Sequence, residues 1–204
     1  MRSLQTSYAR PALWDSVKLG AALGVGSAWA IFGLVLAAGA QLGLPPGTFY
    51  EMIGVSLGQS EEWPAIYLGF GLHMVTGAII GIVYMMISDR TRYLRSFSTL
   101  KWFGTGLATG IAVWAVLFVP LHFIVVQPTL QNMLLMSTDP VMQQRAERLD
   151  QMSDSILYGA LAMHLIFGSI LGFLARIATS SRDVVQAERI GTAAGGVAKY
   201  DAAA

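Results

Sequence analysis

The sequence predicts an all-α membrane protein with four transmembrane helices, and its composition and the placement of its charges support this. Apolar residues make up 54% of the 204 residues and charged residues only 12%, about half the share found in soluble proteins. The mean hydropathy is +0.57. Four long stretches contain no Asp, Glu, Lys or Arg. Each holds roughly 20 apolar residues, the helix length that crosses about 30 Å of hydrocarbon.

The predicted transmembrane helices lie near residues 19–40, 65–88, 102–126 and 156–178. Residues 1–18 precede them, and residues 179–204 are predicted to be a flexible tail because they end in a run rich in Ala and Gly. Residues 49–57 are apolar but too short to span a membrane. They are predicted to form an interfacial or re-entrant helix. Asp139 and Pro140 predict the N-cap and first residue of another, polar helix.

The distribution of Lys and Arg predicts the orientation. Residues 1–18, 89–101 and 179–204 are rich in basic residues, whereas residues 41–64 have none and residues 127–155 have two. Lys and Arg are retained on the cytoplasmic side of a membrane. Both termini are therefore predicted to be cytoplasmic, with two loops on the outer side. The chain has no cysteine, which excludes disulfides and thiolate sites.

A pattern in the second predicted helix recurs in the fourth. Tyr67 and His73 are followed by two glycines, and Tyr158 and His164 are followed by two glycines at the same spacing. The four glycines are Gly77, Gly81, Gly168 and Gly172. Each His and its glycines are four residues apart, so they lie along one helix face.

The first and third predicted helices also resemble each other at their starts. The run that begins at Gly20 and includes Gly24 aligns with the run from Gly104 to Gly110. The match predicts a duplicated helical hairpin, with repeat 1 at about 19–88 and repeat 2 at about 102–178. Two hairpins joined by a cytoplasmic loop are parallel repeats about an axis along the membrane normal. Eight of these glycines are predicted to be helix-packing positions, because small residues let backbones approach closely. They are Gly20, Gly24, Gly77, Gly81, Gly104, Gly110, Gly168 and Gly172.

The histidines of the repeat leave three interpretations open. His73 and His164 are expected at one depth on facing helices, where each can hydrogen-bond a neighbouring helix while the glycines pack. They are also the ligands that a bis-His haem b needs, or, together with His122, ligands for copper or another metal. His122 follows Pro120, which is expected to kink the third helix. The third interpretation is a transporter. Ion-coupled carriers mark the membrane interior with ionisable residues, and these four spans contain none apart from the histidines, so the predicted cargo is a small neutral solute or a lipid.

The Gly-rich first helix, the outer stretch before Pro45 and the repeated His-x-x-x-Gly-x-x-x-Gly pattern resemble small prokaryotic four-helix membrane proteins of the YagU-like type. The resemblance covers about residues 18–178. It implies four helices in an inner or cell membrane, and it carries no catalytic or binding residue onto this chain.

Function is predicted mainly from what the sequence lacks. There is no phosphate-binding loop, carboxylate pair or nucleophile with a base, so no catalytic residue is expected. The Lys and Arg residues of the loop at 89–101 are accounted for by the predicted topology, so no nucleic-acid binding is expected. The leading hypothesis is an accessory subunit without a cofactor that packs against other membrane subunits, or against a second copy, through small-residue faces and its outer loops. A redox complex is one candidate for the assembly.

Overall fold

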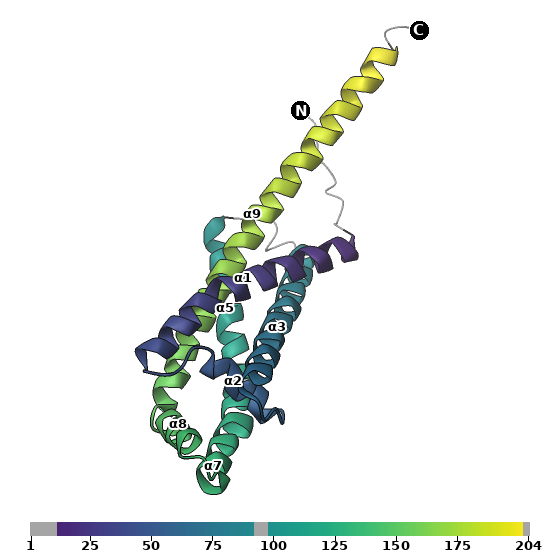
Figure 1. Cartoon of the computed structure of the whole chain (residues 1–204). Helices are drawn as coiled ribbons and strands as arrows, with labels where there is room; N and C mark the ends of the chain where they lie inside the picture. Colours follow the sequence, from purple (N-terminus) through teal and green to yellow (C-terminus); the bar gives the residue numbers. More distant parts are fainter. Residues whose placement is uncertain (1–11, 92–97, 202–204) are drawn as a thin grey trace.

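The computed structural model describes residues 12–91 and 98–201, and every regular element within these ranges is a helix (Figure 1). Four helical segments are long and apolar enough to cross a membrane. They are Leu13–Gln41 (α1), Glu62–Arg90 (α3), Thr99–Met136, and the part of α9 (Ser153–Asp201) up to Arg182. The predicted all-α fold with four membrane-spanning helices is confirmed. Each helix extends beyond its predicted span, because polar and charged residues at its ends continue the helix.

The third segment consists of several successive helical elements. They are α5 (Thr99–Val113), η1 (Trp114–Phe118), α6 (Val119–Leu121), η2 (His122–Val126) and α7 (Gln127–Met136). Proline has no N–H to donate, and its ring crowds the carbonyl one turn earlier. The helix is distorted around Pro120, as predicted: the π-helical turn η1 precedes this residue and the π-helical turn η2 follows it.

The four long segments form two antiparallel pairs. α1 packs on α3 and α5 packs on α9, while contacts between α1 and α9 join the pairs. Buried side chains between the pairs include Met85 and Trp102. The hydroxyl of Tyr84 lies 2.9 Å from the hydroxyl of Thr105 and so links α3 to α5.

A second hydrophobic core lies at one end of the bundle. It is formed by α2 (Thr48–Ser56), α7, α8 (Pro140–Gln151) and the turn after α1, which we call the cap. The short helix predicted at residues 49–57 is thus present as α2. The carboxylate of Asp139 accepts a hydrogen bond from the Val141 N–H at 2.9 Å, which confirms the predicted N-cap of α8. Arg148 donates to the carbonyl of Gly43 at 2.9 Å and holds α8 against the turn.

The opposite end is held together by a buried carboxylate. Asp89, near the end of α3, is 7% exposed and accepts a 2.6 Å hydrogen bond from the hydroxyl of Ser16. The guanidinium of Arg182 lies 3.6 Å from the same carboxylate and donates to the carbonyl of Asp15. These contacts connect α1, α3 and α9 where α9 leaves the bundle.

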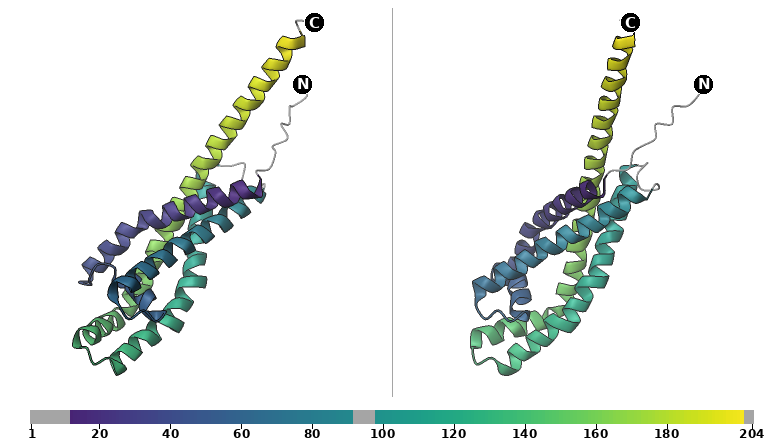
Figure 2. Two further views of the ribbon diagram at one scale, coloured as in Figure 1. Left: turned by 45° about the vertical axis from the view of Figure 1, so that its right-hand side comes forward. Right: turned by 90° about the vertical axis from the view of Figure 1, so that its right-hand side faces the viewer.

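Beyond Arg182, α9 projects away from the other helices as far as Asp201 (Figure 2). The sequence predicts a flexible tail from residue 179, whereas residues 179–201 continue the helix. Residues 179–190 contain no Pro or Gly and include several strong helix formers, so helical propensity there outweighs the glycine-rich composition farther on.

Candidate functional site

The glycines of the first repeated motif form a close crossing between α1 and α3. A Cβ atom added at Gly24 would lie 2.8 Å from the carbonyl carbon of Gly77 and 3.1 Å from the Cα of Gly81. One added at Gly20 would lie 2.6 Å from the Cα of Ile82. Carbon atoms normally approach no closer than about 3.5 Å. The two backbones therefore touch, and the crossing requires glycine at these positions.

The second motif forms a similar crossing between α5 and α9. A Cβ atom added at Gly106 would lie 3.0 Å from the Cα of Gly172, and one at Gly168 would lie 2.9 Å from the nitrogen of Gly110. Gly104, predicted to be a packing position, has no atom within 4 Å of an added Cβ and lies outside the crossing. Two residues turn a helix by about 200°, so Gly104 and Gly106 face opposite ways.

The two crossings also correct the alignment of the repeats. Gly24 contacts Gly77 in the first crossing as Gly106 contacts Gly168 in the second. The structure thus aligns Gly24 with Gly106, while the sequence match aligns Gly20 with Gly104. The sequence-based alignment of these two helices is shifted by two residues.

His73 and His164 are each half-buried next to a crossing. His73 hydrogen-bonds the backbone of Ala28 in α1, and its Nε2 is buried with no hydrogen-bond partner in the described part of the chain. In His164 the Nδ1 lies 2.7 Å from the carbonyl oxygen of Ala160, one turn earlier in α9.

The bond of His164 determines where its proton lies. A carbonyl oxygen only accepts hydrogen bonds, so Nδ1 of His164 carries its proton. In the neutral ring Nε2 then has a free lone pair. This is the arrangement of histidines that bind metals, whose other ring nitrogen donates to a carbonyl or carboxylate.

His122 does not join this pair. Its Nε2 lies 2.9 Å from the hydroxyl of Ser153 at the start of α9, and Gln127 donates to the same hydroxyl. No group of three or more His, Asp or Glu side chains in the described ranges could hold a metal ion. The predicted three-histidine metal site is therefore not assembled. His122 links the third segment to α9.

Aromatic side chains that the sequence did not indicate lie against the histidines. Tyr50 of α2, 3% exposed, places its ring 5.6 Å from that of His73, and its hydroxyl has no hydrogen-bond partner in the described residues. Burial raises the pKa of Tyr50 to about 12. Phe118 lies 5.6 Å from the His164 ring. The sequence signal for Tyr50 was weak, since one tyrosine in a short apolar helix does not reveal which helix it meets.

The repeated tyrosines face away from the histidines. Tyr67 and Tyr158 are both 67% exposed, as expected for aromatic side chains at a membrane interface. No protein family, curated protein or solved structure matches this chain.

Proposed function

We propose that this chain is a non-catalytic subunit of a larger complex in the cell membrane, with both termini in the cytoplasm, and that α1 packs against a helix of another subunit. The observation that carries the proposal is a second small-residue face on α1. This face is exposed and consists of Ala22, Gly26, Ala30, Gly33, Ala37 and Ala40. Added Cβ atoms at Gly26 and Gly33 would meet nothing within 4 Å.

Such a face suits helix association because lipid provides no hydrophobic force between helices. Association in a bilayer depends on close packing, which small residues permit. The buried glycines of the two hairpins, including Gly24 and Gly77, already contact each other within the chain and are not available to a partner. The partner is either another membrane subunit or a second copy of this chain.

The test is Gly33→Leu, with Gly71→Leu as the matched control. Both glycines are exposed on long helices and have open space around an added Cβ. Gly33→Leu should abolish co-purification of the native assembly from solubilised membranes, because a bulky side chain separates the helices. Gly71→Leu should leave the assembly intact. A wild-type chain that runs as a solitary stable monomer from native membranes would count against the proposal.

The arrangement of His73 and His164 favours a second candidate, a subunit that transfers electrons through a bis-His haem b or copper. Both side chains hydrogen-bond backbone groups, His164 through Nδ1, and the Nε2 of His73 is buried without a partner in the described residues. Haem b would supply one-electron chemistry, and the protein would supply its two axial nitrogens. Purified protein should show a Soret band that is lost in His73→Ala and in His164→Ala. A colourless, metal-free preparation would exclude this candidate.

A further inference from the structure

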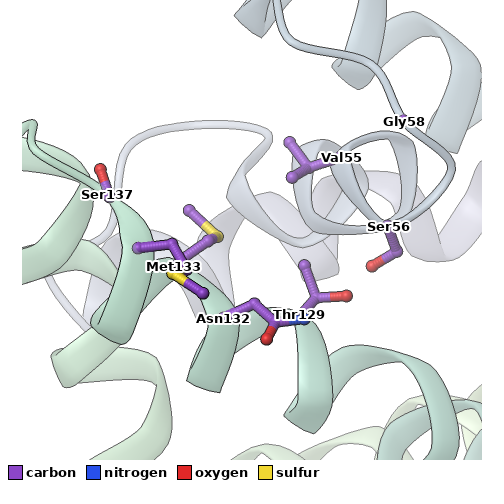
Figure 3. Close-up of a pocket in the computed structure, with 8 residues that line it drawn as sticks. Val55, Ser56, Gly58, Thr129, Asn132, Met133 and Ser137 are labelled. Carbon is purple, nitrogen blue, oxygen red and sulfur yellow. The ribbon is translucent and has the colours of Figure 1, made fainter.

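The cap carries an open groove of about 480 Å³ between the end of α2 and α7 (Figure 3). Val55 and Ser56 line it from α2, and Thr129, Asn132 and Met133 line it from α7. None of its lining residues is charged. A groove with apolar walls and neutral hydrogen-bonding groups suits an uncharged or apolar side chain.

Large apolar side chains are exposed around this groove. Leu135 is 79% exposed and Met136, which also lines the groove, is 81% exposed. Leu57 and Val141 are exposed nearby in the sequence, next to α2 and in the first turn of α8. The helical segment Thr99–Met136 has 38 residues, a length of about 57 Å, which exceeds about 30 Å of hydrocarbon even when tilted. With the span beginning near residue 102, as the sequence predicts, the last turn of this segment lies beyond the hydrocarbon, so lipid tails do not cover its exposed apolar side chains.

The surface of the cap is acidic. Residues 41–64 and 127–155 together hold seven Asp or Glu and two Arg. Six of these acids are exposed, namely Glu61, Glu62, Asp139, Glu147, Asp150 and Asp154. Arg148 donates to the Gly43 carbonyl and is therefore engaged within the cap. Two of these acids are close in the sequence to residues that line the groove. Glu61 comes three positions after Gly58, and Asp139 comes two positions after Ser137.

We propose that the cap docks a basic protein surface, in which Lys and Arg side chains surround an apolar side chain that enters the groove. An apolar centre with a charged rim is the usual anatomy of a protein interface, and complementary charge directs the choice of partner. Anionic lipid headgroups would be repelled by the same acids, so a membrane surface fits this charge less well. The inference rests on the proposed function and names the class of partner that its cap would bind.

The experiment places a photo-crosslinking phenylalanine analogue at Leu135 of the full-length protein in native membranes. The control carries the analogue at Ile79, which is exposed on the membrane-spanning part of α3. Leu135 should crosslink to a protein with a basic surface, and raising salt from about 50 mM to about 500 mM should reduce the yield, because salt screens exposed charges. Crosslinks to lipid only, to an acidic protein, or with unchanged yield at high salt would each overturn the inference.

Charge variants give the second measurement. Glu61→Gln with Asp139→Asn removes two exposed charges that lie within three residues of groove residues in the sequence, and Asn retains the capping ability of Asp139. The matched control, Asp150→Asn with Asp154→Asn, removes one charge at the end of α8 and one in the first turn of α9. Asp150 lies about 16 Å along α8 from Asp139, which exceeds the screening length. The first pair should lower the crosslinking yield about fivefold and the control less than about twofold. Equal effects would contradict a site at the groove.

The two proposals can fail separately. If Gly33→Leu leaves the membrane assembly intact while the Leu135 crosslink behaves as expected, the helix contact of α1 is wrong and the docking at the cap stands. If Gly33→Leu disrupts the assembly and Leu135 crosslinks only lipid, the inference about the cap alone is wrong.

Discussion

Adding one methyl group at Gly24 should destabilise the protein, whereas adding it two residues away at Gly26 should not. At Gly24 the new Cβ would lie 2.8 Å from the carbonyl carbon of Gly77, and closer still to its oxygen. Relief requires α1 and α3 to separate by about 1 Å, which loses a quarter to a half of the dispersion energy of the atoms in contact. Overpacking of this kind costs about 1–3 kcal/mol.

The control separates this effect from helix propensity. Gly26 is exposed with no atom within 4 Å of an added Cβ. Replacing an exposed glycine in a helix by alanine is worth up to about 1 kcal/mol. Gly26→Ala should therefore leave the free energy of unfolding unchanged or slightly higher. Both variants are measured in detergent micelles by titration with sodium dodecyl sulfate, followed by circular dichroism. Equal stability of Gly24→Ala and Gly26→Ala would refute the close crossing.

Three further predictions concern the other crossing and the buried polar groups. Gly106→Ala should lower the free energy of unfolding by about 1–3 kcal/mol, and Gly104→Ala should not, in the same titration. Tyr50→Phe removes a buried hydroxyl that lacks a partner and should stabilise the protein by about 1 kcal/mol at neutral pH. Because the pKa of Tyr50 is raised to about 12, the unfolded chain loses this proton first as pH rises through about 10 to 12, so the wild type loses stability there. Between these pH values the free energy of unfolding of Tyr50→Phe should fall by about 2–3 kcal/mol less than that of the wild type. An equal fall in both proteins would contradict the burial of this hydroxyl. Asp89→Asn leaves Arg182 facing an uncharged group and should lower the thermal unfolding midpoint in detergent. An unchanged midpoint would show that these contacts do not hold α9 to the bundle.

The long helices were predictable because hydrocarbon imposes a strict rule on composition. A span cannot carry solvated charge, so the gaps between charged residues, such as that between Lys101 and Asp139, mark the helices directly. Local chemistry also predicted the start of α8, since the side chain of Asp139 caps the helix whatever surrounds it. The extension of α9 to Asp201 was missed because composition alone says little about a helix outside the membrane.

The register of the crossings was not predictable for a physical reason. A helix as rich in glycine and alanine as α1 offers several small-residue faces, and the chain alone does not show which one meets α3. Gly24 lies in the crossing and Gly26 faces outward, although both are glycines two residues apart. For the same reason Gly104 was predicted to be a packing position, whereas Gly106 is the glycine that lies in the crossing of α5 and α9. Only the position of the partner helix resolves it.

The packing and ligand hypotheses for the histidines make different predictions because the two side chains have different partners. His73 bonds to Ala28 of another helix, while His164 bonds to Ala160 of its own helix. The position that corresponds to Ala28 in the second crossing is Gly110, which packs against the backbone of His164.

If the histidines serve packing alone, His73→Ala should therefore cost more stability than His164→Ala, by about 1 kcal/mol, since only His73 loses a bond between helices. If they hold one haem or metal between them, either substitution removes one of two ligands, and both should abolish the absorbance band and cost similar stability. The titration and the absorbance spectrum of the same two variants distinguish these outcomes. Unequal stability in a colourless protein would support packing, and equal loss of an absorbance band would support ligation.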